Sequence, residues 1–180
     1  YEGFVTPSKQ TVKILADGSA KVDYYYVRKE LIVTFVNGDT KKEVTYLYGK
    51  ENQAFTNNGF TKTGYTLTGY SNTSGGSKNY EVTSTVTGEF IDKHYPSKTV
   101  YVVFTANTYK IAFNNNGGTG SMDAITCTYD KDCTLTKNAF TKTGYTFAGW
   151  SKTSTGAIEY TNGSTVKNLL TSGSMTLYAK

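Results

Sequence analysis

Alternation of hydrophobic and polar residues, the pattern of half-buried strands, begins near the N-terminus. Residues 11–15 (Thr-Val-Lys-Ile-Leu) alternate, an Asp17–Gly18 turn follows, and residues 20–27 form a second run of the same kind. Asp-Gly between two such runs is a strong signal for a hairpin, although a lone hairpin is barely stable in water. We therefore predict that residues 1–30 form a β-hairpin, the tail of an upstream module or a linker that rests on the segment after it.

Two longer series of strand patterns follow this hairpin. The predicted strands are 31–36, 45–48, 65–70 and 100–104 in the first series, and 109–113, 126–129, 145–150 and 175–179 in the second. In the second series, residues 164–170 predict a short helix capped by Ser164. The matching part of the first series has three additional residues and contains His94 and Pro96. We expect a surface loop there.

The two series are copies of one unit. Residues 60–86 align with 140–166 without a gap, and 16 of the 27 positions are identical. The segment Phe60–Thr66 recurs unchanged as Phe140–Thr146. A repeat of this period indicates a tandem array of modules. We predict two of them, residues 31–108 and 109–180, each so small that only about 60% of its unfolded surface would be buried.

The composition agrees with strands and narrows the possible partners. Thr, Tyr and Val suit a pleated sheet, and charged residues make up only 18%. The net charge of +5 comes from 19 basic residues that are scattered, with nothing denser than a pair such as Lys41–Lys42. Nucleic-acid binders concentrate such charge in a patch, so we expect no nucleic-acid partner. No apolar run approaches the length of a membrane span, and we expect no membrane insertion. The sequence starts without Met, and we expect an excised piece of a larger protein.

Candidates for catalysis and metal binding are few. The single histidine, His94, has no counterpart in the second repeat and no obvious nucleophile near it in sequence. Asp130 and Asp132 are the only close acidic pair that stands out, and a calcium site needs more oxygen ligands than this pair offers. We expect a protein that is not an enzyme and that has no cofactor and no metal site.

Cys127 and Cys133 lie symmetrically about Asp130. If residues 129–131 form a hairpin turn, the two cysteines face each other across it within disulfide range. We predict a disulfide, which would stabilise the fold by about 2 kcal/mol at best and would fit an oxidising environment. A reduced pair or a pair of metal ligands is the alternative. The counterparts of these cysteines in the first repeat are expected to be Tyr46 and Asn52.

Aromatic residues make up 14% of the chain, with 16 tyrosines and one tryptophan. Trp150 and its counterpart Tyr70 close the repeated segment, and we expect them in the core of each module. A sugar-binding platform would instead expose such rings to stack on a ligand. For Tyr25 and Tyr48 both interpretations stay open, and we treat them as possible ligand contacts.

The second repeat resembles a known family. The run 144–150 (Gly-Tyr-Thr-Phe-Ala-Gly-Trp), preceded by 113–118 and followed by 177–179, resembles the Listeria–Bacteroides repeat, also called internalin B-repeat-like. The resemblance covers residues 109–180 well and residues 31–108 less closely. It implies a β-grasp-like module, a small curved sheet with one helix, found in tandem on bacterial cell-surface proteins.

These observations together predict a β-rich α+β fold of tandem β-grasp-like modules, mostly antiparallel, each with at most one short helix. The expected function is that of a non-enzymatic structural or adhesion repeat region, acting as a spacer and a weak interaction surface. The alternative is a ligand-binding module that recognises carbohydrate or a host protein through surface aromatic residues. The resemblance implies an extracellular location, with attachment to the cell wall through another part of the parent protein, and a host or envelope protein or carbohydrate as partner.

Overall fold

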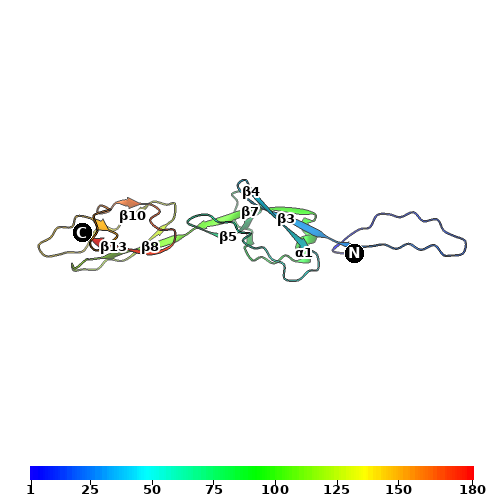
Figure 1. The fold of residues 1–180 in the computed structure, drawn as a ribbon, viewed down its shortest axis with the longest axis horizontal. Helices are drawn as coiled ribbons and strands as arrows, with labels where there is room; N and C mark the ends of the chain where they lie inside the picture. Colours follow the sequence, from blue (N-terminus) through cyan, green and yellow to red (C-terminus); the bar gives the residue numbers. More distant parts are fainter. The chain divides into compact units, whose positions relative to one another are not determined.

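A computed structural model of the chain describes residues 1–180 and divides them into two compact units. Unit 1 comprises residues 1–60 and 67–103, and unit 2 comprises residues 61–66 and 104–180 (Figure 1). The fold is β-rich with one short helix. Its elements are β1 (Phe4–Val5), β2 (Val27–Arg28), β3 (Glu30–Asn37), β4 (Thr40–Leu47), β5 (Tyr65–Ser71), β6 (Tyr80–Glu81), α1 (Gly88–His94), β7 (Ser97–Ala106), β8 (Thr108–Asn114), β9 (Ile125–Thr128), β10 (Cys133–Thr134), β11 (Trp150–Ser151), β12 (Thr165–Val166) and β13 (Gly173–Ala179).

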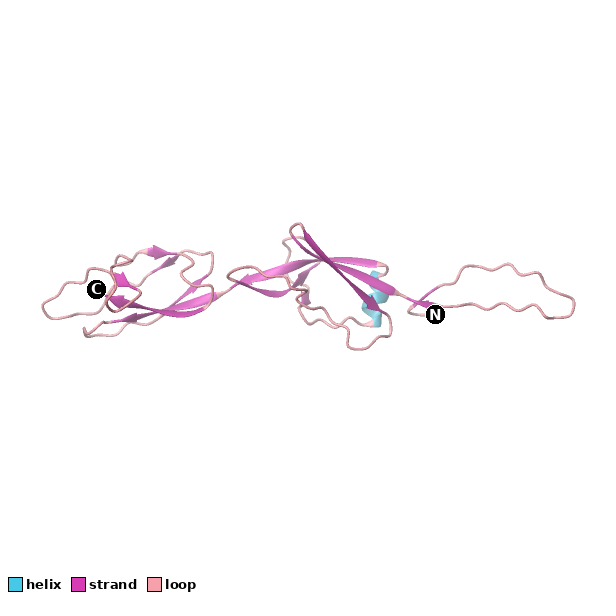
Figure 2. Ribbon diagram, in the orientation of Figure 1, coloured by secondary structure: helices cyan, strands magenta, loops and turns pink.

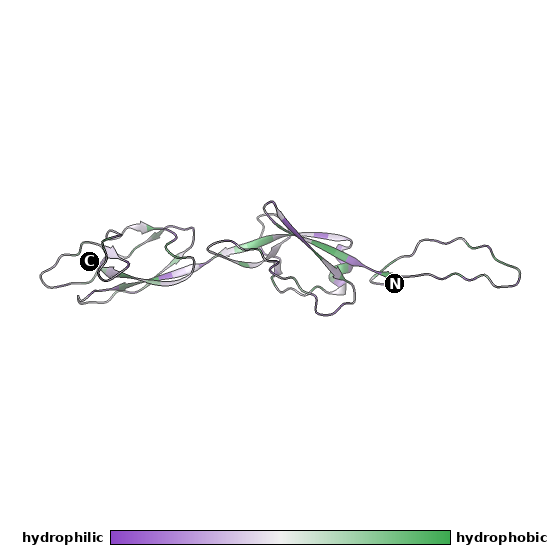
Figure 3. Cartoon of the chain, viewed as in Figure 1, coloured by the Kyte–Doolittle hydropathy of each residue, from purple (hydrophilic) through white to green (hydrophobic).

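The main sheet of unit 1 has the strand order β4-β3-β7-β5-β6. β3 pairs antiparallel with β4 across a tight turn and parallel with β7 on its other side. Alternate residues of β3, namely Leu31, Val33 and Phe35, are fully buried, as period-two alternation predicts. The strands accordingly carry both hydrophobic and hydrophilic stretches in Figure 3. The expected strand positions of the first series are therefore confirmed, and the order in space adds a parallel pair at the centre of the sheet.

The helix α1 lies where the sequence predicted a surface loop, and that prediction was wrong. Thr87 caps its first turn, the Oγ1 atom accepting a hydrogen bond from the Phe90 N–H at 3.2 Å. Glu89 in the first turn and the basic residues of the last turn complement the helix dipole. Ile91 is fully buried, and this anchor on the sheet gives a seven-residue helix its stability.

The helix predicted for residues 164–170 is absent. Thr165 and Val166 form strand β12, which pairs with β10 in a small sheet of its own. Asn168 has a φ of 54°, a left-handed conformation that an α-helix does not tolerate. The side chain of Asn168 holds the turn at Asp130 instead, as described below.

Unit 2 repeats the arrangement of the four main strands of unit 1 without a helix. Its main sheet has the order β11-β13-β8-β9, with β8 and β9 antiparallel and β8 and β13 parallel. These strands take the positions of β5, β7, β3 and β4. Trp150 is fully buried, which is the core position expected for it. The buried core of unit 2 consists of Tyr109, Ile111, Cys127, Leu135, Phe140, Trp150, Val166 and Leu177.

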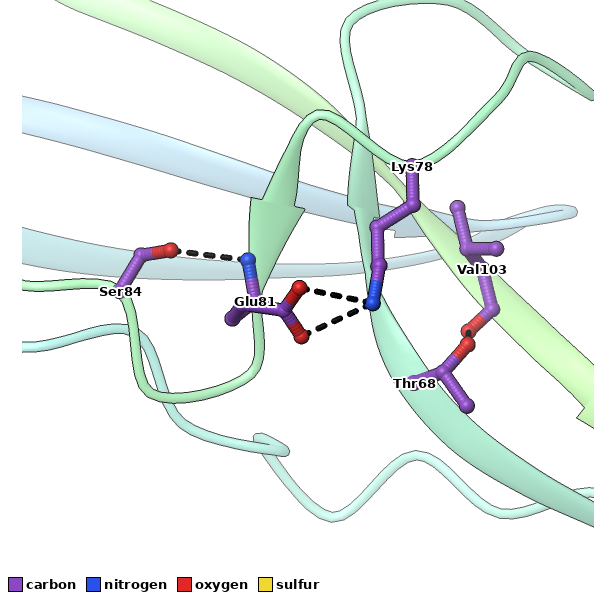
Figure 4. A network of polar contacts seen from close by, with 5 residues as sticks. All are labelled: Thr68, Lys78, Glu81, Ser84 and Val103. Atoms are coloured by element: carbon purple, nitrogen blue, oxygen red, sulfur yellow. Dashed lines mark hydrogen bonds and ion pairs between the residues drawn. The ribbon is translucent and has the colours of Figure 1, made fainter.

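Polar side chains fix the edge of the sheet in unit 1 (Figure 4). Lys78 Nζ lies 2.7 and 2.9 Å from the two carboxylate oxygens of Glu81, and the Glu81 N–H donates to Ser84 Oγ at 2.8 Å. Thr68 Oγ1 donates to the Val103 carbonyl oxygen at 3.2 Å. The short strand β6 is thereby held at a solvated edge by charged and hydroxyl groups, an arrangement that discourages pairing with other chains.

The N-terminal segment pairs only at its base. β1 and β2 join Phe4 to Arg28 and Val5 to Val27, and no strand lies between Val5 and Val27 (Figure 2). Gly18 N–H does donate to the Leu15 carbonyl at 3.1 Å in the expected turn. The strand pairing predicted on either side of Asp17–Gly18 is not confirmed. Most side chains of this segment are exposed, so a ladder there would gain little from burial.

Candidate interaction surface

A turn of residues 62–65 carries a tyrosine ring in unit 2. The Tyr65 N–H donates to the Lys62 carbonyl at 3.0 Å, and Gly64 between them has a φ of 75°. Gly64 is buried because the ring of Tyr129 lies directly on it. A Cβ atom on Gly64 would lie 2.3 Å from Tyr129 Cδ1. The left-handed conformation and the close ring contact therefore both require glycine.

Two backbone hydrogen bonds accompany this contact. The Asn107 N–H donates to the Gly64 carbonyl at 2.9 Å, and the Tyr129 N–H donates to the Asn107 carbonyl at 2.8 Å. Asn107 thus connects the turn to the strand end that bears the tyrosine. We call this arrangement of a turn glycine, a tyrosine ring on it and one bridging residue the glycine–tyrosine clasp.

The same clasp occurs in unit 1. Gly3 has a φ of 76°, and a Cβ atom on it would lie 2.1 Å from Tyr48 Cδ1. Lys29 is the bridging residue: its N–H donates to the Gly3 carbonyl at 2.9 Å, and its carbonyl accepts from the Tyr48 N–H at 3.0 Å. Tyr48 follows β4 as Tyr129 follows β9, and the next residue, Gly49 or Asp130, has positive φ in both places. Each clasp therefore sits at the same corner of its sheet.

Side chains reinforce the clasp in unit 2. Tyr65 Oη donates to Asp130 Oδ2 at 2.9 Å, and the rings of Tyr65 and Tyr129 meet edge to face at 5.9 Å. Asn168 Nδ2 donates to Asp130 Oδ1 at 2.7 Å. The bond from Asn168, and after it the bond from Tyr65, holds the pKa of the Asp130 carboxyl below its usual value. The hydrogen bond that Tyr65 donates to Asp130 also raises the pKa of Tyr65.

Tyr25 and Tyr48, the predicted ligand contacts, lie in different surroundings. Tyr25 is 82% exposed in the N-terminal segment. Tyr48 is half-buried, with its ring against Gly3 and Gly88. Its partial burial, followed by the negative charges of Glu2 and Asp92, raises its pKa. A ligand would therefore meet the open face of Tyr25, whereas the ring of Tyr48 is already engaged by the clasp.

A third copy of the turn, residues 142–145, borders a groove in unit 2. The groove has a volume of about 490 Å³. Its walls include the turn residues Lys142, Thr143 and Tyr145 and two aromatic rings, Phe140 and Phe147. Tyr145 is 72% exposed, and Lys142 Nζ lies 4.9 Å from the centre of its ring. Aromatic, polar and cationic side chains thus line the groove together.

The predicted disulfide between Cys127 and Cys133 is present, with the Cα atoms 5.6 Å apart. The expected hairpin geometry is wrong, because Cys133 pairs with Val166 of β12 and not with the strand of Cys127. The bridge therefore joins the main sheet of unit 2 to its small sheet. It closes the loop that carries Asp130 and so supports the clasp.

Unit 1 closes the corresponding loop without cysteines. The bridge between Ala54 and Thr85 matches the pairing of Thr134 with Thr165, which makes Gln53, and not Asn52, the counterpart of Cys133. Gln53 Oε1 accepts from the Leu47 N–H at 2.8 Å, and its Nε2 donates to the Leu47 carbonyl at 2.7 Å and the Lys50 carbonyl at 3.0 Å. An amide clamp in one repeat thus takes the place of a disulfide in the other.

The remaining candidates for chemistry have structural surroundings. His94 ends α1, where its Nδ1 lies 2.9 Å from the Phe90 carbonyl and its ring stacks near that of Phe90. No three His, Cys, Asp or Glu side chains gather in a group able to hold a metal ion. No helix has the length and apolar character needed to cross a bilayer.

The second repeat matches a family model, that of the Listeria-Bacteroides repeat domain, over residues 109–180. The match covers 72 of the 180 residues and supports the family that the sequence resembles. Within unit 2 the match leaves out only 61–66 and 104–108, the segments that carry Gly64 and the bridging residue Asn107. Repeats of this family occur in extracellular surface proteins of bacteria. No curated protein matches the chain.

The clasp residues Gly3, Gly64 and Tyr129 were missed by the sequence analysis. The Gly-Tyr-Thr block was found, but Tyr129 lies 65 positions beyond Gly64, and no periodicity links the two. The residue that follows each clasp tyrosine, Tyr48 or Tyr129, could have indicated the site. Gly49 and Asp130 are both residue types that tolerate positive φ and so mark a sharp turn beside the ring.

Proposed function

We propose that this chain is a non-enzymatic structural and adhesion repeat region of a bacterial cell-surface protein, acting as a spacer with a weakly interacting surface. The main support is the repeated clasp: each unit holds a Gly-aromatic turn on the tyrosine at the same corner of its sheet. Such a contact serves to connect successive pieces of chain, which is what a spacer needs. The family match of residues 109–180 supports the location at the cell surface.

Each unit is proposed to be a β-grasp-like module. Support comes from the common plan of a sheet in which an antiparallel pair lies beside a parallel third strand, β7 in unit 1 and β13 in unit 2. Attachment to the cell wall would come from another part of the parent protein. The partner would be a protein or carbohydrate of the host or the envelope.

The alternative function, recognition of carbohydrate or a host protein, is favoured by one observation. Tyr24, Tyr25 and Tyr26 are 47%, 82% and 44% exposed, and rings of this kind stack on sugars. A catalytic function has less support, since His94 packs against Phe90 and makes a local backbone contact. Turnover of any substrate that His94→Ala abolishes would contradict the non-enzymatic proposal.

A binding screen separates the two functions. The chain would be tested against arrays of glycans and extracellular-matrix proteins, together with the variants Tyr25→Ala and Ile14→Ala. Both side chains are more than four-fifths exposed, at 82% and 87%, so neither substitution should change stability. A saturable partner lost only in Tyr25→Ala would establish the binding function. Absence of saturable binding across the arrays is the result expected for a spacer.

A further inference from the structure

The turn 142–145 has the sequence and backbone of the turn 62–65. No tyrosine from another segment of the chain lies on its glycine. Gly64 and Gly144 have φ values of 75° and 78°, and Tyr65 and Tyr145 close their turns with the same 3.0 Å hydrogen bond. Yet Gly64 is buried beneath Tyr129, whereas a Cβ atom on Gly144 would have no neighbour within 4 Å. The same seven-residue segment is thus occupied in one copy and open in the other.

The strand that follows the turn differs in the same way. β5 begins at Tyr65 and continues to Ser71, directly from the occupied turn. Its counterpart after the open turn is β11, which comprises only Trp150 and Ser151. Residues 145–149 between the open turn and β11 form no strand. Of these two copies of the segment, the occupied one is therefore followed by the longer strand.

We infer that the turn Lys142–Tyr145 is a docking site for the tyrosine-bearing sheet corner of a further repeat module. The incoming tyrosine, equivalent to Tyr48 and Tyr129, places its ring on Gly144 and completes a third glycine–tyrosine clasp. This inference goes beyond the proposed function because it specifies how one module receives the next. The occupant is identified by the two clasps already present, both of which seat a tyrosine on the turn glycine.

The chemistry of the site favours a particular corner. In unit 2, Asp130 follows the clasp tyrosine and accepts a hydrogen bond from Tyr65 Oη. An aspartate at this position of the incoming module would accept from Tyr145 Oη in the same manner. Lys142, which lines the groove and lies over the Tyr145 ring, adds a positive charge that attracts this carboxylate.

The test is a longer chain in which residues 1–180 are followed directly by a second copy of residues 104–180. The joining point follows from the sheet register. Val100 pairs with Phe35, and Leu177 pairs with the equivalent residue Phe113, so Leu177 is equivalent to Val100. Lys180 is then equivalent to Val103, and the appended copy begins with the next residue, Phe104. Linkage also gives the appended copy a high effective concentration at the turn. The readout is amide hydrogen exchange at residues 144–148, compared with the 180-residue chain.

We expect protection of these amides to rise about tenfold or more in the longer chain. Tyr129→Ala in the appended copy should abolish the increase, whereas Tyr129→Phe should keep it, because the ring makes the contact. Gly144→Ala supplies a second variant that leaves the appended copy unaltered, and it should also abolish the increase. Equal exchange in the two chains, or protection that survives both Tyr129→Ala and Gly144→Ala, would overturn the inference. Neither result depends on whether the arrays above yield a binding partner, so the proposed function stands or falls separately.

Discussion

Replacing Gly64 by alanine tests whether the glycine–tyrosine clasp stabilises unit 2. The new Cβ atom would lie 2.3 Å from Tyr129 Cδ1 and 2.4 Å from Cε1 and Cγ, so the ring must move. Displacing a packed ring costs about 1–3 kcal/mol. Alanine at a φ of 75° adds a conformational cost of about 1–2 kcal/mol. The expected loss in the free energy of unfolding is the sum of these two costs.

Gly144→Ala is the matched control. It lies in the same seven-residue sequence, has a φ of 78°, and a Cβ atom there meets nothing within 4 Å. Only the conformational cost should therefore appear. Both glycines belong to unit 2, so one unfolding transition reports on both variants. The difference between them isolates the contact with Tyr129 and should be about 1–3 kcal/mol.

Urea unfolding followed by tryptophan fluorescence is the appropriate assay, because Trp150 is the only tryptophan and is buried in the core of unit 2. Removing the ring should remove the difference: in a Tyr129→Ala background, Gly64→Ala should cost no more than Gly144→Ala does. Equal destabilisation by Gly64→Ala and Gly144→Ala in the native background would refute the reasoning. It would mean that moving the Tyr129 ring costs no free energy.

Three further predictions concern the supports around the clasp. Replacing Cys127 and Cys133 by serine should lower the free energy of unfolding of unit 2 by about 2 kcal/mol. Trp150 fluorescence measures this difference from the oxidised chain. A reductant should leave the stability of the serine variant unchanged. Gln53→Ala should destabilise unit 1 by about 1–3 kcal/mol, because the Leu47 N–H loses its partner; far-ultraviolet circular dichroism should show this loss while the Trp150 transition stays in place. In the folded chain, the pKa of Asp130 lies below its usual value of 3.8. As the pH falls, the carboxyl is therefore protonated in the unfolded state before it is protonated in the folded state. The stability that Asp130 contributes is present above about pH 4 and is lost as the pH falls through the folded pKa. Asp130→Asn should remove this part of the acid dependence of the urea midpoint, and Glu159→Gln, which removes a second lowered pKa in unit 2, should remove only its own part.

Periodicity was enough to place most strands but not to order them. The apolar and β-branched run 31–36 predicted β3, in which Leu31, Val33 and Phe35 alternate with residues that are exposed or partly buried. The parallel pairing of β3 with β7 joins residues 65 positions apart, and no local pattern carries that information. The helix showed the same limitation. Thr87 was a suitable cap with Glu89 behind it, but the three additional residues of this region favoured a loop.

The cysteine prediction succeeded for a reason other than the one that suggested it. Spacing alone brought Cys127 and Cys133 within reach of each other, and the disulfide is present. The symmetrical hairpin used to justify it is absent, because Cys133 belongs to a second small sheet. Recognising Gln53 as the functional counterpart required the register of that sheet in unit 1, since glutamine and cysteine share no sequence property that would relate them.

The open turn of unit 2 separates two requirements for glycine that the clasp normally combines. Gly144 keeps a φ of 78° with no ring upon it, so the conformation belongs to the turn itself and does not result from the tyrosine. A partner that docks there meets a turn whose backbone already has the conformation of the clasp, and only the segment 145–149 after it, which forms no strand, would have to extend its pairing. Preformed sites bind more tightly for a given contact area, because less conformational freedom is lost on association. An array built from such turns would therefore gain its joints at low entropic cost, while each joint would still depend on a single glycine that no other residue can replace without strain.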